Sequence, residues 1–450
     1  MMSRSWFHRR VGAGVWHEKE GQRRMRMRRA GRVTVAVGAL ALMGVMPGAA
    51  PAQQNRRALV VQSTTSVRDS GVLDQLITPQ FKRRFPQYDL KFIAVGTGQA
   101  ITNARAGQGD VLIGHAPPLE RQFVRDGFSY ERVGRTVMWN DFVIVGPASD
   151  PAGVLRRART DAVGAMEAIA AAGAAGKANF VSRGDKSGTN TKELDLWGRS
   201  RVARTPDNEP SGSSAWYHKA GLGMADTLRL TQQCPFAGGG CYTITDRGTL
   251  QQLTSRRAIT RLRPVMDNQS ARARGGQNLM LNVYNVYAIN PRKFRSVNLQ
   301  GALAFMDFLT SPSFQRALAT FPSRRRPGFF PAAAPRVTLS RRPRRAVAAG
   351  SVVTVTGRIR SAVPGAPSLR GMSVRLARLP TPVTPVVLAR ARVGAGGTFR
   401  LRARVKRSGT LFVTTPRFRN LSPLSLSLGR FTVRGRASRL TGAPARARRE

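Results

Sequence analysis

Two short loops carry side chains suited to holding an anion. One follows a strand pattern at 179–181, precedes a helix pattern, and reads Ser182-Arg183-Gly184-Asp185-Lys186-Ser187-Gly188-Thr189-Asn190. Its glycines let the backbone approach a ligand and present consecutive N–H groups, and the start of the following helix adds a positive dipole end. The hydroxyls of Ser187 and Thr189 supply further donors. These features predict an oxyanion cradle.

The second loop, Ser63-Thr64-Thr65-Ser66, consists of four uncharged hydroxyl residues. Neutral donors and one arginine can hold a buried dianion, because amides and helix ends supply a field without full counter-charges. Either loop alone is also typical of an ordinary turn with a helix cap. Two such loops on strand–helix units of one chain favour ligand binding, and the sequence has no G-x-x-x-x-G-K-[ST] loop for a nucleotide phosphate.

The segments around these loops alternate between strand and helix. Buried-strand patterns at 59–61, 91–95, 111–113 and 142–145 are separated by segments of helical periodicity. This order predicts an α/β architecture with parallel sheets and helices on both faces. Ligands of such sheets bind at the carboxyl ends of the strands, which is where both loops lie.

Residues 1–52 show the order of a secretory signal. Arginines at 23–32 precede an uncharged run at 33–46, and cleavage is expected after Ala52. The run is shorter than the about 20 apolar residues of a membrane span, although an uncleaved anchor is the alternative. We hypothesise that translation starts at Met25 or Met27. From this signal we expect an exported, extracytoplasmic protein. Because no cysteine occurs before Cys234, we expect that it is not a lipoprotein.

The positive charge concentrates near the carboxyl end. The 450 residues include 74 Lys+Arg and 23 Asp+Glu, and residues 331–450 hold 26 of these basic residues against the single acid Glu450. A Gly/Pro-rich linker is predicted at 327–335. Seven short alternating runs then predict a small all-β, immunoglobulin-like sandwich at 336–437, followed by a basic tail at 438–450. The runs lie at 337–339, 352–356, 373–376, 386–388, 398–402, 410–414 and 430–434.

The motifs of residues 58–322 together resemble the solute-binding proteins of tungstate ABC transporters, which have a periplasmic-binding-protein-like fold of type 2. The resemblance does not extend to the sandwich. Three positions depart from the family pattern, with Ser63 for Thr, Lys186 for Asp and Asn190 for His, and none removes the arginine or the hydroxyls. The segments that carry the resemblance are Ser63–Ser66 with Asp69-Ser70-Gly71, Val95–Gly98, Asn140–Pro147, Ser182–Thr189, Ala215–Tyr217 with Gly221–Met224, Tyr242–Thr249 and Ala302–Leu309.

The resemblance implies two lobes that close on an oxyanion. The first lobe would comprise 53–146 and about 260–326, and the second 147–259. Arg183 would pair with the anion, Thr97 would lie nearby, and Asp185 would orient Arg183 or cap the following helix. The hydroxyl and glycine residues that would bind the anion are Ser63, Thr64, Thr65, Ser66, Ser187, Gly188 and Thr189. The protein would be a monomer that delivers tungstate to a membrane permease, with no cofactor, metal or enzymatic step.

Several alternatives stay open. Molybdate nearly matches tungstate in size and charge, and a phosphate-binding protein could use Asp185 to accept the proton of hydrogen phosphate. A rival of another class is an envelope protein whose Arg-rich sandwich binds an anionic polymer or lipid surface. Aromatic residues are too sparse there to favour nucleic acid. Cys234 and Cys241 are expected to form a disulfide rather than a zinc site, because no histidine is near them.

Overall fold

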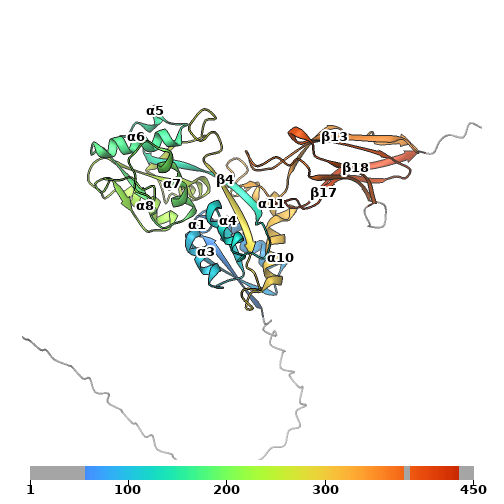
Figure 1. Ribbon diagram of the computed structural model, residues 1–450, viewed down its shortest axis with the longest axis horizontal. Coiled ribbons are helices and arrows are strands. Elements are labelled where there is room, and N and C mark those ends of the chain that lie inside the picture. Colours follow the sequence, from blue (N-terminus) through green and yellow to red (C-terminus); the bar gives the residue numbers. More distant parts are fainter. Residues whose placement is uncertain (1–55, 380–385, 435–450) are drawn as a thin grey trace, which may run out of the picture. The chain divides into compact units, whose positions relative to one another are not determined.

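The computed structural model describes residues 56–379 and 386–434. The predicted signal at 1–52 and the basic tail at 438–450 lie outside the described residues. Within them, the chain forms two α/β lobes followed by an all-β domain (Figure 1). The α/β fold class and the additional all-β domain predicted from the sequence are therefore confirmed.

The first lobe is a mixed sheet with helices packed on it. Its strands pair in the order β2-β1-β3-β9-β4; the first three are parallel, whereas β9 is antiparallel to both neighbours. The strands are β1 (Arg57–Thr64), β2 (Tyr88–Val95), β3 (Val111–Gly114), β4 (Arg135–Pro147), β9 (Leu281–Ala288) and β10 (Phe330–Pro331). The helices are α1 (Thr65–Asp69), α2 (Thr78–Arg84), α3 (Thr97–Arg105), α4 (Pro117–Arg125), α10 (Leu299–Thr310) and α11 (Pro312–Leu318), with a π-helical turn at Leu73–Ile77.

The second lobe repeats the strand–helix pattern. β5 is parallel to β6 and β7, and its buried Phe180 packs edge-on against Trp197 of α7 with ring centroids 5.4 Å apart. This packing holds β5 against the C-terminal part of α7. The strands are β5 (Ala178–Ser182), β6 (Tyr217–Lys219), β7 (Gly240–Asp246) and β8 (Leu262–Met266). The helices are α5 (Val154–Arg157), α6 (Ala162–Ala174), α7 (Gly188–Arg199), α8 (Met224–Gln233) and α9 (Arg247–Ser255).

Strand β4 is shared by the two lobes. Residues 135–141 pair with β9 of the first lobe, and residues 142–147 pair with β7 and β8 of the second. The chain returns to the first lobe later than expected, because Val265, Met266 and Met280 lie in the core of the second lobe. The first lobe therefore resumes at β9, and the predicted boundary near residue 260 was wrong.

The predicted linker at 327–335 is largely part of the first lobe. Phe329 is fully buried in that lobe's core, and Phe330 and Pro331 pair with β4. The ring of Phe329 packs edge-on against Tyr284, with centroids 5.5 Å apart. Glycine and proline at 327–331 suggested a linker, but the aromatic side chains between them bury apolar area that a solvated linker would expose.

The C-terminal domain contains two packed sheets of order β11-β13-β16 and β12-β18-β17-β14-β15. The inward residues Val355, Leu401 and Val413 are buried between them. All seven predicted runs fall within strands, and β12 is an additional short strand. The strands are β11 (Arg336–Arg341), β12 (Ala346–Ala348), β13 (Val352–Arg360), β14 (Ser373–Leu379), β15 (Val386–Arg392), β16 (Thr398–Arg404), β17 (Gly409–Thr415) and β18 (Leu424–Arg434), with a 3₁₀ turn at Ala395–Gly397.

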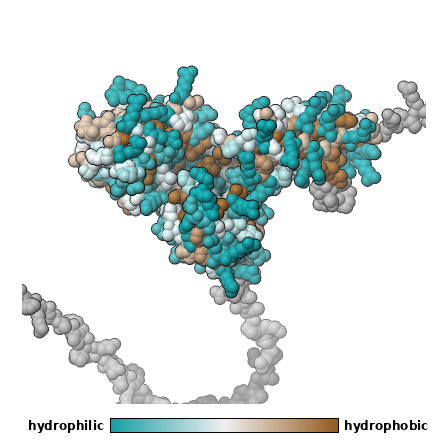
Figure 2. All heavy atoms as spheres, in the orientation of Figure 1, coloured by the Kyte–Doolittle hydropathy of each residue, from teal (hydrophilic) through white to brown (hydrophobic). Residues whose placement is uncertain are grey.

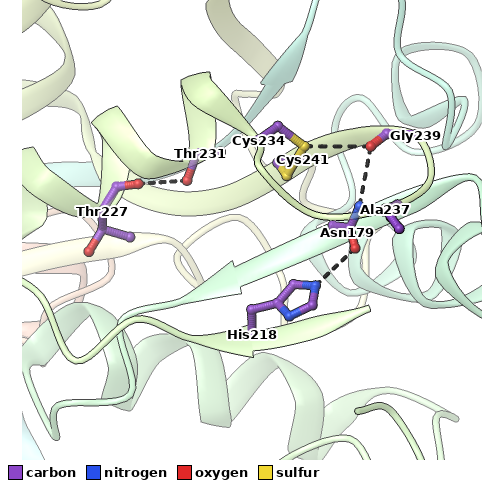
Figure 3. The surroundings of a disulfide bond; sticks show 8 residues. All are labelled: Asn179, His218, Thr227, Thr231, Cys234, Ala237, Gly239 and Cys241. Atoms are coloured by element: carbon purple, nitrogen blue, oxygen red, sulfur yellow. Dashed lines mark hydrogen bonds between the residues drawn. A yellow bond between two sulfur atoms is a disulfide. The ribbon is translucent and has the colours of Figure 1, made fainter. Parts of the chain in front are cut away.

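Cys234 and Cys241 form a disulfide in the second lobe (Figure 3). It joins the end of α8 to β7 and closes the loop between them. Asn179 of β5 fastens this loop by donating from Nδ2 to the carbonyl oxygens of Ala237 and Gly239, at 3.1 and 3.2 Å. Glycine is needed at 239, because a Cβ there would lie 1.6 Å from the Lys177 carbonyl oxygen.

Candidate functional site

Three strands of the first lobe end at one edge of its sheet. The carboxyl ends of parallel β1, β2 and β3 lead directly into Thr65, Gly96-Thr97 and His115. Polar side chains at this edge are buried, yet the Oγ atoms of Ser63 and Ser66 and the Oγ1 of Thr97 have no hydrogen-bond partner. Buried hydroxyls without partners are costly, by about 1–3 kcal/mol each. Three together indicate that the edge is built for a ligand.

The second lobe contributes the end of β5 and the start of α7. Arg183 follows β5 directly, and its Nε and Nη1 have no partner although the side chain is only 1% exposed. Thr189 in the first turn of α7 has a buried Oγ1 that is also unpartnered. The 12-residue helix α7 adds its positive dipole end at this point.

Asp185 holds Arg183 in place. One of its carboxylate oxygens accepts from Nη2 of Arg183 at 2.5 Å, and the other accepts from the backbone N–H of Ser187 at 3.1 Å. The same Nη2 donates to Oγ1 of Thr65 in the first lobe at 3.0 Å. Asp185 thus orients the guanidinium and fixes the turn before α7, so that Nε and Nη1 remain available.

The remaining predicted residues have structural partners. Thr64 caps α1 by accepting from the backbone N–H of Val67 at 3.3 Å, and Ser187 caps α7 by accepting from that of Asn190 at 3.2 Å. Thr65 accepts from Arg183, as described above. Thr64, Thr65 and Ser187 each accept one bond and keep their O–H group as a donor. The side-chain atoms without any hydrogen-bond partner are the hydroxyl oxygens of Ser63, Ser66, Thr97 and Thr189 and the Nε and Nη1 of Arg183.

The buried carboxyl of Glu193 holds the start of the Arg183 loop in place. Ser182 donates from Oγ to Glu193 at 2.7 Å and accepts from the backbone N–H of Gly184 at 3.1 Å. Tyr217 also donates to Glu193, at 2.7 Å. Burial raises the pKa of Glu193 to about 7, against the opposing effect of these hydrogen bonds. Helical periodicity alone did not reveal this role of Glu193.

His115 also lies at this site, although it is not among the site residues predicted from the sequence. Its ring lies against Gly188, since a Cβ on Gly188 would come within 2.7 Å of both ring nitrogens. Its Nε2 is buried without a partner. The available signal was its position immediately after β3, at the same sheet edge as the first hydroxyl loop.

The lobes touch directly beside these groups. The backbone N–H of Gly98 in α3 donates to the carbonyl oxygen of Lys186 at 3.2 Å, and Asp69 accepts from the backbone N–H of Ala225 at 2.9 Å. These contacts enclose the unpartnered donors. Among the described residues, no cluster of three His, Cys, Asp or Glu side chains could hold a metal ion. No helix of the described part is long and apolar enough to cross a membrane.

Replacing Gly98 with alanine should hinder lobe closure. The new Cβ would lie 2.8 Å from the Lys186 carbonyl oxygen, so the lobes could not approach as closely. A cost of about 1–2 kcal/mol, or roughly tenfold in anion affinity, is expected. Because alanine favours helix over glycine, α3 itself should not suffer. Titration calorimetry of the variant measures the effect.

Gly223→Ala is the matched control for this prediction. It also places a Cβ at the lobe interface, but 3.5 Å from Cγ2 of Thr65, which is ordinary contact. Its anion affinity should stay within about twofold of the parent, because no atom must move. Equal affinities of the two variants would contradict the assignment of the Gly98–Lys186 contact to closure.

Comparison with known proteins places the chain in a family. The model of the PBP superfamily domain matches residues 49–313. A protein of Haloferax volcanii, named as a candidate ABC transporter anion-binding protein, is 40% identical over 61% of this chain and 71% of its own length. The tungstate-binding protein TupA of Peptoclostridium acidaminophilum is 35% identical over 60% of this chain and 82% of its own length.

A solved structure is also similar to this chain in sequence. The tungstate ABC transporter structure from Geobacter sulfurreducens is 38% identical, covers 59% of this chain and 98% of its own, and has a TM-score of 0.48. The matched part of this chain is the two-lobed part that carries the site, and the C-terminal sheets lie beyond the family match. The chain belongs to the PBP superfamily and, within it, to the family of the tungstate-binding proteins TupA.

Proposed function

We propose that the chain is an extracytoplasmic solute-binding protein that captures tungstate between its lobes and delivers it to the permease of an ABC transporter. The observation that carries this proposal is the set of buried donors without partners, contributed by both lobes. They include Nε and Nη1 of Arg183, whose Nη2 bridges to Thr65 of the other lobe. A tetrahedral oxyanion offers only acceptors, which complements a site of donors.

Tungstate is a permanent dianion and needs only donors, whereas hydrogen phosphate also carries a proton to donate. A phosphate that keeps a proton needs an acceptor, and Asp185 is the carboxylate adjacent to Arg183. Both of its oxygens are already engaged, one by Arg183 and one by the N–H of Ser187. The names of the relatives support tungstate, and molybdate would present the same charge and shape. Such a site binds and releases its ligand without a bond being broken or a cofactor being needed.

Titration calorimetry of residues 53–450 with tungstate, molybdate, sulfate and phosphate tests the proposal. We expect tight binding of tungstate, comparable or weaker binding of molybdate, and weak binding of sulfate and phosphate. Absence of binding to all four anions would overturn the proposal. Preferential binding of phosphate would replace tungstate with phosphate as the ligand and leave the fold assignment intact.

We also propose that the C-terminal domain binds a linear anionic polymer of the cell envelope. The exposed face of the β11-β13-β16 sheet carries arginines and hydroxyl residues, and the sequence has no acid between Asp307 and Glu450. Arg336 pairs directly with Arg360, although like charges opposite one another disfavour the sheet. Rows of hydrophilic side chains cross this domain in Figure 2. The exposed arginines of the face are Arg336, Arg358, Arg360, Arg400, Arg402 and Arg404.

Retention on immobilised polyphosphate tests this second proposal. Arg400, Arg402 and Arg404 recur about 7 Å apart along β16. Replacing all three with glutamine should clearly lower the salt concentration at which the protein elutes from the column. The control removes equal charge from the binding domain by replacing the exposed residues Arg83, Arg125 and Arg229 with glutamine. Equal losses in both triple variants would show that net charge, and not this face, governs retention.

A further inference from the structure

His115 occupies a position that the donor set alone does not explain. Its ring stacks on Tyr284 with centroids 4.7 Å apart, and on the other side it lies against Gly188. Its Nδ1 is 2.9 Å from Oδ1 of Asn282, whereas Nε2 is buried without a partner. A side chain this enclosed, with one ring nitrogen held and the other free beside the oxyanion cradle, is positioned to act on the ligand.

A chain of amides fixes which nitrogen of His115 carries a proton. The Gly328 carbonyl oxygen can only accept, and Nδ2 of Asn140 donates to it at 3.3 Å. Oδ1 of Asn140 therefore accepts from Nδ2 of Asn282, at 2.8 Å. This leaves Oδ1 of Asn282 as an acceptor, so Nδ1 of His115 must be the donor. In the neutral ring Nε2 then carries a lone pair, which cannot donate to an oxyanion.

Burial keeps the ring of His115 neutral while the site is empty. The pKa of His115 is lowered to about 4, mainly by desolvation and also by the positive charge of Arg183, while the hydrogen bond with Asn282 and the charge of Asp185 act in the opposite direction. Two other titratable groups lie around the ring. Tyr284 is buried and stays neutral, and Asp246 is linked to His115 through hydrogen bonds of Asn140 and Asn282.

The charges around the cradle require compensation when a dianion enters. Arg183 is already paired with Asp185, so these two side chains contribute no net charge. A dianion would then leave two negative charges enclosed between the lobes, balanced only by dipoles. Buried charge without a counter-charge is costly, and a proton on the adjacent imidazole would offset half of it.

We propose that His115 takes up one proton from solvent when the oxyanion binds and donates Nε2–H to it, so that capture is coupled to protonation and release to deprotonation. This inference rests on the proposed oxyanion-binding function. The complex then binds one more proton than the free protein. Affinity for the dianion should therefore rise as pH falls, by about tenfold per pH unit, wherever His115 is neutral in the free protein and protonated in the complex.

Titration calorimetry with molybdate at pH 7, in buffers of different protonation enthalpy, measures the proton uptake directly. We expect close to one proton per anion. His115→Gln, which cannot be protonated, should show uptake near zero and a flat pH dependence of affinity. His218→Gln is the matched control, since His218 is the only other histidine of residues 53–450 and makes a hydrogen bond with Asn179. It should keep the full uptake.

Nitrogen NMR of the unaltered protein gives a second measurement that does not depend on how well a variant folds. The Nε2 signal of His115 should move from the unprotonated to the protonated range on adding molybdate, while that of His218 stays in place. Binding heat without proton uptake, or uptake that persists in His115→Gln, would overturn the inference and leave the proposed function standing. Absence of binding of both molybdate and tungstate would overturn the function itself.

Discussion

Tungstate binding should fall by about 3 kcal/mol, or more than about a hundredfold, when Arg183 is replaced with alanine. Nε and Nη1 of this side chain are the charged donors that the site leaves unpartnered. Its loss also removes the bond from Nη2 to Thr65 that joins the lobes, and leaves Asp185 facing the anion uncompensated. Ligand affinity and lobe closure are therefore both weakened. Titration calorimetry with tungstate measures the loss.

Two further variants separate the role of Arg183 from that of charge in general. Arg199→Ala removes a half-exposed arginine from α7, the helix that follows the Arg183 loop, where it pairs with Asp195, and should leave affinity unchanged. Arg183→Lys keeps the charge but loses the planar fork that reaches Thr65, Asp185 and the ligand together, so its affinity should be intermediate. Tungstate affinity that survives in Arg183→Ala would place the site elsewhere in the chain.

The second large effect is on stability. Phe329→Ala should lower the free energy of unfolding of the first lobe by about 3–5 kcal/mol, because it empties a fully buried aromatic position. The ring packs against Tyr284, which in turn stacks on His115. Anion affinity should consequently fall as well. Chemical unfolding followed by tryptophan fluorescence, with and without tungstate, measures both effects.

Phe330→Ala provides the comparison. Phe330 is only half-buried and stacks on Trp139 at 4.4 Å, so its removal should cost about 1 kcal/mol. A much larger loss of unfolding free energy for Phe329→Ala than for Phe330→Ala is expected if this segment is part of the hydrophobic core. Small and equal effects would mean that residues 327–335 behave as the solvated linker that their glycine and proline content suggests.

Much of the fold follows from local patterns in the sequence. Buried runs such as 59–61 and 111–113 alternate with helical periodicity, and this alternation requires α/β packing whatever the neighbours are. The alternating runs after residue 336 likewise predict strands, and the structure contains all seven. The boundary of the lobes and the burial of Phe329 escaped prediction, because pairing along β4 and packing against Tyr284 are contacts between residues distant in the sequence.

The candidate site, like the fold, could be predicted from the sequence only in part. The chemistry of the site can be predicted from the sequence, since hydroxyls and glycines after strands, with Arg183 among them, indicate donors for an anion. Local sequence did not show which hydroxyls have partners: Thr64 and Ser187 accept bonds as helix caps, whereas Ser66 and Thr189 are buried without any partner. The tertiary structure also brought His115 against Gly188. The physical reason is that hydrogen-bond satisfaction and burial depend on which strands meet at a sheet edge, and local sequence does not encode that meeting.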